Sequence, residues 1–263
     1  MRKGIVVLFF QISWFAVFSQ DIGFAKKTVD TLTTEYFAGR GAVNDGEKKA
    51  ANFIGNHFKE QGLQSFNNSF FQEFNAPINT FPNKMEVIID GKEIAPGKDF
   101  IIDAASGKGD GTYELYWFNA KNFSGKDEFN KLVEADFFAD KFVVLALKKT
   151  DVVSEIIRNL KENKVGAAGV IFIDNKLTQH LSFVAQNYPI IHVGKEIITE
   201  SSKSITVKID QELLPNYRSQ NVIGFVEGTE HPDSFIVLSA HYDHLGKWGQ
   251  THIFLGQMIM QVV

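Results

Sequence analysis

The chain has 263 residues, 44% of them hydrophobic, which is enough for one large core or two modest ones. Its net charge of -4 and the lack of a sustained basic run argue against nucleic acid as the main partner. Because there is no cysteine, disulfides and thiolate metal sites are excluded, and any metal must be bound by histidine and carboxylate ligands.

A charged tip and an apolar run open the chain. Met1-Arg2-Lys3 precedes Gly4–Phe18, which has the length of a signal-peptide core and is short for a membrane span. Ser19 is a small residue before Gln20, so we predict a cleaved signal peptide over residues 1–19. The protein is then exported, to the periplasm, the cell surface or the medium, without membrane contact after cleavage. An uncleaved membrane anchor is the alternative.

Two amphipathic helices are predicted next. Apolar residues three and four apart indicate a helix over Asp21–Thr33, and a second helix begins at Asp45 and ends at Gly62. The break between them contains Gly39-Arg40-Gly41. We interpret Arg40 as a loop anchor and give it no catalytic role.

Short strands and a further helix follow. Phe70–Phe74 and Met85–Ile89 are predicted strands, and a hairpin signal, Asp90-Gly91, comes after the second. From about Gly97 short strands alternate with turns and a helix. The elements expected there are strands at Tyr113–Phe118 and Phe142–Leu147, a helix at Val152–Asn163 and a buried strand that ends at Ile173. This alternation predicts a second α/β unit.

The stretch Ser219–Gly256 contains the residues that indicate chemistry. Asn221–Val226 and Phe235–Ala240 are predicted strands, separated by a polar segment with Gly228 and Pro232. The second run is apolar almost throughout, which is typical of a strand buried on both faces of a sheet. We therefore expect a central strand there, with functional groups where it ends.

His241-Tyr242-Asp243-His244 follows this run directly. Residues two apart on an extended segment project to the same side, so His241 and Asp243 are expected to be neighbours. A neutral imidazole binds zinc through one nitrogen while a carboxylate accepts a hydrogen bond from the other. A satisfied polar strand end is the alternative, and His244 is a weaker candidate for a substrate or supporting contact. Four other histidines have no partner at ligand spacing and are expected to be solvated or satisfied in the core: His180, His192, His231 and His252.

Two segments resemble the zinc-dependent exopeptidases of metallopeptidase family 28, the aminopeptidase and glutamate carboxypeptidase group. NVIGFVEGTEHPDSFIVLSAHYDHLG is similar to the segment that opens their catalytic half, and TTEYFAGRGAVNDGEKKAANFIGNHFKEQGL to their N-terminal helical segment. The resemblance implies that His241 is a ligand to one of two zinc ions and that Asp243 orients it. It also implies a peptide substrate that is cleaved at a chain end, and we predict an aminopeptidase.

The second α/β unit resembles the protease-associated domain that is inserted in many members of this family. The similar segments are ADKFVVLAL, NKVGAAGVIF and YPIIHVGKE, and a generic α/β insertion is the alternative. The implied fold class is α/β, the N-terminal part of a mixed-sheet zinc-exopeptidase domain, incomplete here, with an inserted α/β protease-associated domain. We expect the first part of the peptidase domain over residues 20–96, the insertion over 97–214, and the start of the catalytic half over 215–256.

The family motif Gly-Ala-Asn-Asp-Asn-Ala-Ser-Gly, whose aspartate bridges the two metals, does not follow Gly256. If the codons GCA AAT GAT AAT GCA AGT GGT lose their first base, they read Gln-Met-Ile-Met-Gln-Val-Val, which is Gln257–Val263. We therefore expect an out-of-frame tail over 257–263, and a chain with little peptidase activity because the general base and the other zinc ligands are missing. A genuine, divergent C-terminus is the alternative.

Two other functional classes compete with this reading. A non-enzymatic binding protein can use the same scaffold and protease-associated domain. No Gly-x-Ser-x-Gly occurs in the sequence, which disfavours a serine hydrolase. The motif His-Glu-x-x-His, which would indicate a different type of metallopeptidase, does not occur either.

Overall fold

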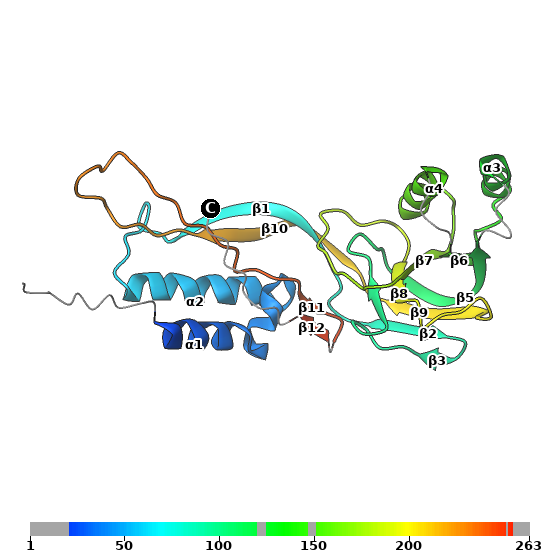
Figure 1. Cartoon of the computed structure of the whole chain (residues 1–263), viewed down its shortest axis with the longest axis horizontal. Coiled ribbons are helices and arrows are strands. Elements are labelled where there is room, and N and C mark those ends of the chain that lie inside the picture. The colour runs from blue at the N-terminus through cyan, green and yellow to red at the C-terminus, as the bar shows by residue number, and fades with distance from the viewer. Residues whose placement is uncertain (1–20, 120–124, 147–150, 251, 255–263) are drawn as a thin grey trace, which may run out of the picture.

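A computed structural model describes residues 21–119, 125–146, 151–250 and 252–254 of the chain (Figure 1). The expected signal peptide at 1–19 and the expected tail at 257–263 lie outside these residues. Within the described part, no helix has both the length and the apolar character needed to cross a membrane.

The described chain forms two helical turns, four α-helices and twelve strands. In order they are α1 Ile22–Leu32, the 3₁₀ turns Glu35–Arg40 and Val43–Asp45, α2 Gly46–Glu60, β1 Phe71–Thr80, β2 Met85–Ile89, β3 Lys92–Glu93, β4 Phe100–Ile102, β5 Gly109–Phe118, α3 Lys126–Glu134, β6 Lys141–Leu145, α4 Asp151–Lys161, β7 Gly169–Asp174, β8 Ile190–Gly194, β9 Ser204–Ile209, β10 Glu212–Val222, β11 Gly246–Trp248 and β12 His252–Phe254.

The N-terminal lobe consists of α1 and α2, and both predicted helices are confirmed. Helix α1 begins at Asp21, whose carboxylate accepts a hydrogen bond of 3.0 Å from the N–H of Phe24. Such a cap satisfies one of the free donors of the first turn. The two helices are held together by a small core of Leu32, Phe37 and Ala50.

The distal lobe is an eight-stranded mixed sheet in the order β3-β2-β9-β5-β6-β7-β8-β4. Strands β5 to β8 run parallel and the outer strands pair antiparallel. The parallel strands β6, β7 and β8 are mostly apolar, as expected where both faces of a sheet are covered, and His192 is the polar exception within β8. Strands β2 and β3 also belong to this sheet, although they precede residue 97, where the second unit was expected to begin.

Each face of this sheet has its own core. Helices α3 and α4 pack on one face, where Phe129, Ile156 and Leu160 are buried against it. On the other face the cluster includes Phe81, which follows β1, and Trp248, which belongs to β11. The segment that follows the candidate site is therefore part of the core of the distal lobe.

A long two-stranded ribbon connects the two lobes (Figure 1). Its strands β1 and β10 pair antiparallel from Phe71 opposite Val222 to Thr80 opposite Glu212. The ribbon runs beside α2 and leads into the sheet, so the chain enters and leaves the distal lobe at the same place (Figure 1).

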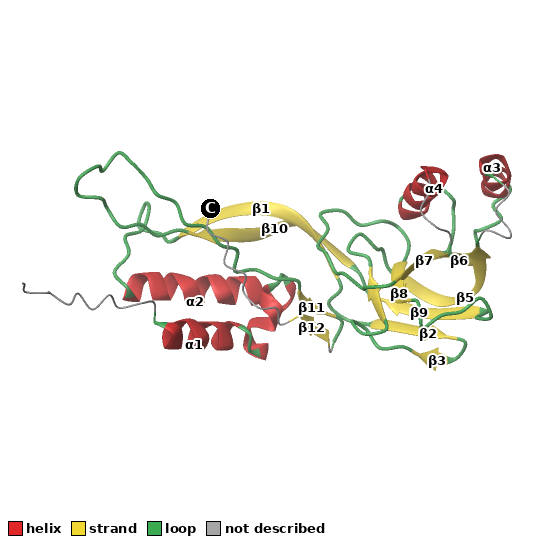
Figure 2. Ribbon diagram, in the orientation of Figure 1, coloured by secondary structure: helices red, strands yellow, loops and turns green. Residues whose placement is uncertain are grey.

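The predicted central strand Phe235–Ala240 is not formed. Residues 223–245 form a loop that projects beyond the ribbon, with an isolated bridge between Gln64 and Phe225 as its only pairing among the described residues (Figure 2). Phe235 and Ile236 are 81% and 95% exposed. The run has strand-forming side chains, but a strand also needs a neighbour for its main-chain hydrogen bonds, and none of the described strands lies beside it.

Candidate functional site

The candidate ligand His241 and its partner Asp243 lie together in this loop. The Nδ1 atom of His241 is 3.0 Å from the carbonyl oxygen of Asp243 and 3.6 Å from the carboxylate oxygen Oδ1. The two side chains are 62% and 51% exposed. Nδ1 is thus hydrogen-bonded to the main-chain carbonyl of Asp243 and not, as expected, to its carboxylate. Nε2 is on the opposite side of the ring, and a main-chain carbonyl can orient an imidazole for a metal as a carboxylate does. The pair is close even though the expected strand is absent.

A left-handed turn of the N-terminal lobe holds the segment that carries this pair. Ala38, Gly39 and Arg40 have φ angles of 45°, 67° and 55°, and positive φ is uncommon for residues other than glycine. The Arg40 side chain is buried, and its Nε donates to the carbonyl oxygen of Tyr242 at 2.8 Å. The carbonyl oxygen of Arg40 accepts from the N–H of His244 at 3.0 Å. Arg40 is thus a loop anchor, and the loop it anchors is the candidate site.

Close backbone contact and a buried indole join the site to both lobes. A Cβ atom on Gly39 would lie 2.7 Å from the carbonyl oxygens of Gly246 and Phe254, so only glycine permits this approach. Trp248 is 4% exposed and stacks on Phe81 with ring centroids 4.6 Å apart. The candidate site therefore lies where the two lobes meet.

Tyr242, between the two candidate residues, is also held from β10. Its hydroxyl donates to the carbonyl oxygen of Gln220, and the Gln220 side-chain Nε2 is 3.2 Å from the Tyr242 oxygen. The same Nε2 donates at 3.0 Å to Oε1 of Glu47, which also accepts from the Ser219 hydroxyl. Glu47, on α2, is 6% exposed. Sequence reasoning missed Glu47 and Gln220 because these bonds join residues far apart in the chain and no local pattern indicates them.

Burial and charge set the protonation of this network. Burial raises the pKa of Tyr242 to about 12, opposed by the Gln220 hydrogen bond and assisted by the charge of Glu47. The phenol therefore remains a donor near neutral pH. Burial lowers the pKa of Arg40 from its ordinary value, and the nearby charge of Asp243 opposes that change. Burial also lowers the pKa of His244, which favours its neutral form.

A cavity of about 50 Å³ adjoins Asp243. It is lined by Arg40, Glu47 and His244 on the side of the N-terminal lobe, and by Leu181 from the loop between β7 and β8 of the distal sheet. This space suits a few water molecules rather than a peptide side chain. His244 lines this cavity together with Asp243.

The described residues do not by themselves make up the ligand set that a zinc site needs. Hydrolytic zinc normally has three protein ligands. No group of three or more histidine, aspartate, glutamate or cysteine residues suited to a metal occurs in the part of the chain that the structure describes. His241 would offer such a site one imidazole, held by Asp243, and a pair of zinc ions needs more ligands than that.

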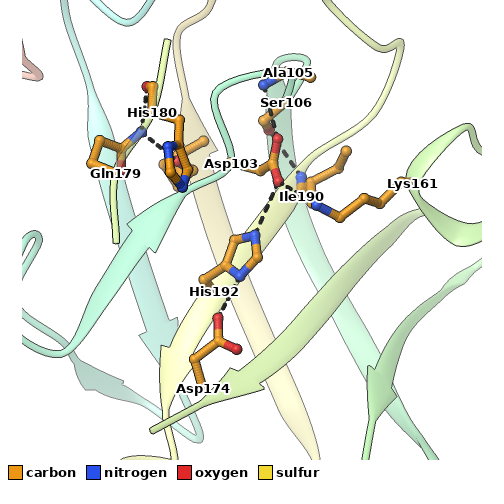
Figure 3. Close-up of polar contacts among 10 residues, drawn as sticks. Asp103, Ala105, Ser106, Lys161, Asp174, Gln179, His180, Ile190 and His192 are labelled. Atoms are coloured by element: carbon orange, nitrogen blue, oxygen red, sulfur yellow. Dashed lines mark hydrogen bonds and ion pairs between the residues drawn. The ribbon is translucent and has the colours of Figure 1, made fainter. Parts of the chain in front are cut away.

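A second polar cluster surrounds His192 in the distal lobe (Figure 3). The Nδ1 atom of His192 is 2.6 Å from Asp174 Oδ2, and Nε2 is 3.0 Å from Asp103 Oδ2, which Lys161 also contacts at 3.0 Å. Burial would raise the pKa of Asp103, but the bonds from His192 and Ala105 and the charge of Lys161 hold it well below its ordinary value. His192 is thus a satisfied imidazole, as expected, with partners that its sequence neighbours did not indicate.

His180, His231 and His252, the remaining members of the group expected to be solvated or satisfied, stay apart from the candidate pair. His180 and His231 are exposed. His252, on β12, is partly buried, and burial lowers its pKa. None of the three forms a hydrogen bond to His241 or Asp243 in the described structure.

Comparison with known proteins identifies the fold. No protein-family model and no curated protein sequence matches the chain. Several solved structures do match it. A peptidase M28 precursor from Shewanella amazonensis has a TM-score of 0.55 and 15% identity, covering 82% of this chain and 53% of that one. A zinc aminopeptidase from Bacillus subtilis has a TM-score of 0.51 and 22% identity, covering 78% of this chain and 47% of that one.

The chain shares their fold. The predicted α/β class with a mixed sheet is therefore confirmed. At these identities the likeness concerns the fold alone, and the chain spans about half the length of each of the two solved chains.

Proposed function

We propose that this chain is part of an exported, zinc-dependent exopeptidase, an aminopeptidase in preference to a carboxypeptidase. The observation that carries the proposal is the contact between the two family-like segments: Arg40, from the first, donates to Tyr242, which stands between His241 and Asp243 in the second. The shared fold supports the same conclusion. Peptides ending in a free amine are the proposed substrates.

The proposed roles follow from the geometry of the pair. Nε2 of His241 is the ligand atom for one zinc ion, and Asp243 holds the ring through Nδ1. Zinc, when bound, activates a water molecule and polarises the scissile carbonyl. The described residues offer neither the other zinc ligands nor a general base. We propose that these are encoded by the restored reading frame beyond the Gly256 codon.

The distal sheet is proposed to be the protease-associated insertion. Its strands come from residues 85–209, between the two strands of the connecting ribbon. An insertion is expected to enter and leave its host domain at neighbouring points, as β1 and β10 do here.

The test begins with the gene. Resequencing across the Gly256 codon should reveal one additional base that restores Ala-Asn-Asp-Asn-Ala-Ser-Gly and an open frame beyond it. The extended protein and the 263-residue chain are then assayed on aminoacyl anilides and on N-blocked peptides with free carboxyl ends, with and without a chelator.

We expect chelator-sensitive release of the N-terminal residue by the extended protein, abolished by His241→Ala and retained in His231→Ala, a matched change at an exposed histidine of the same loop. A confirmed stop after Val263, together with an inactive chain, would favour the non-enzymatic binding protein instead. Activity on the free carboxyl end would change the assignment to a carboxypeptidase.

A further inference from the structure

Arg40 binds both peptide groups that flank Asp243. Its side-chain Nε donates to the carbonyl oxygen of Tyr242, which belongs to the peptide group before Asp243. Its main-chain carbonyl accepts from the N–H of His244, which belongs to the peptide group after Asp243. Because each peptide group is planar, holding one atom of each restricts both backbone dihedrals of the residue between them.

Nothing else in the described structure holds Asp243 so directly. The His241 and Asp243 side chains are more than half exposed, and neither residue is paired with a strand in the described structure. The Asp243 carbonyl oxygen, which lies 3.0 Å from His241 Nδ1, belongs to the same peptide group as the His244 N–H, and that N–H is bound to Arg40. Arg40 is buried and has a positive φ angle, so it costs free energy both to desolvate its charge and to hold its backbone in the left-handed region.

We propose that Arg40 is a positioning residue that sets the direction of the peptide group after Asp243 and, through the Asp243 carbonyl oxygen, the orientation of the His241 ring. This inference deepens the proposed function and rests on it for its catalytic meaning. The geometric part is independent of zinc, substrate and activity. A purely structural Arg40 would stabilise the turn without altering the His241–Asp243 pair.

The substitution Arg40→Lys separates these two possibilities. Lysine keeps the positive charge but lacks the planar guanidinium group. Arg40 uses that group to donate from Nε to the carbonyl oxygen of Tyr242 and from Nη1 to that of Leu32, both at 2.8 Å. The matched control is Asp90→Ala. Asp90 Oδ1 accepts from the backbone N–H groups of Lys203 and Ser204 in the distal lobe, so its loss also removes a side-chain clamp on the main chain.

The measurement is the ¹⁵N spectrum of the His241 imidazole in the metal-free 263-residue chain at one fixed pH, assigned with His241→Gln. In Arg40→Lys we expect the His241 Nδ1 signal to move away from its wild-type position, because its bond to the Asp243 carbonyl oxygen is disturbed, while Asp90→Ala leaves it unchanged. Wild-type His241 signals in a folded Arg40→Lys protein of lowered melting temperature would overturn the proposal.

Two further measurements complete the test. In the unmodified protein, the Arg40 Nε–H and the His244 amide should exchange slowly with solvent, and fast exchange of both would refute the proposal even if Arg40→Lys does not fold. In an active extended protein, Arg40→Lys should lower kcat about 10–100-fold, the usual effect of losing a residue that orients a metal ligand. An inactive extended protein would refute the proposed function and leave the spectroscopic result standing.

Discussion

Gly41 and Gly246 touch backbone to backbone, although they lie at opposite ends of the sequence. A Cβ atom on Gly41 would lie 2.4 Å from the Cα of Gly246, and one on Gly246 would lie 2.8 Å from the Cα of Gly41. In both cases the obstructing atom is main chain, which has no rotamer by which to move away. The two glycines therefore set how closely the candidate site approaches the N-terminal lobe.

Replacing Gly246 by alanine should destabilise the protein through this contact. A matched control is available, because Gly246 and Gly62 have φ angles of 79° and 76°, but nothing lies within 4 Å of a Cβ on Gly62. Gly62→Ala should cost about 1–2 kcal/mol for the left-handed backbone alone. Gly246→Ala should cost about 1–3 kcal/mol more from overpacking, as measured by denaturant unfolding. Equal losses would show that the contact does not constrain the native state.

The Asp103 cluster should make stability depend on acid pH. The pKa of Asp103 is depressed in the folded protein, so its contribution is complete above its unfolded value of about 4 and is lost as pH falls through the lower, folded value. At neutral pH, Asp103→Asn should cost about 1.5–3 kcal/mol, because bonds from His192 and Lys161 to a charged acceptor are lost.

Urea unfolding of wild type and Asp103→Asn at pH 7 and at pH 3 measures this effect. The difference between the two proteins should shrink at the lower pH. Asp140→Asn is the control, because Asp140 pairs with Lys141 at a largely exposed position, where ion pairs contribute little. A difference between wild type and Asp103→Asn that stays the same at both pH values would contradict the assignment.

Zinc should not stabilise the 263-residue chain. One imidazole with one orienting carboxylate binds the ion weakly compared with three protein ligands. The melting temperature with zinc chloride should therefore equal that with a chelator, and His241→Ala should not change it either. A melting temperature that rises with zinc concentration in wild type and not in His241→Ala would show that the chain itself completes a metal site.

The exposed apolar run Phe235–Leu238 should lower the solubility of the protein by promoting association. Four successive large apolar side chains are 71–95% exposed, and such runs associate through strand pairing. Ile236→Lys should raise the concentration at which the protein stays monomeric, while its unfolding free energy changes by less than about 0.5 kcal/mol. The same change at Ile190, which is 1% exposed, should instead prevent folding. Unchanged aggregation in Ile236→Lys would place the associating surface elsewhere.

Local patterns predicted the elements whose stabilising contacts are local or continuous. Helices α1 and α2 follow the spacing of their apolar residues, and β6 and β7 follow their unbroken apolar runs. The same reasoning failed for Phe235–Ala240, because an apolar run becomes a strand only beside a partner. It also missed β9 and β10, since their pairing with β2, β5 and β1 depends on residues at least 90 positions away.

By itself, the sequence determined the α/β class, the helices of the N-terminal lobe, and the choice of His241 and Asp243 as the residues to examine. Only the tertiary structure decided that Arg40 binds the peptide groups around Asp243, that Glu47 and Gln220 hold Tyr242, and that Asp103 and Asp174 enclose His192. The physical reason is the range of the interactions. The periodicity of a helix is visible over a few residues of sequence. A buried polar group instead forms hydrogen bonds with partners that the fold places beside it, and the neighbouring sequence does not indicate which residues these are.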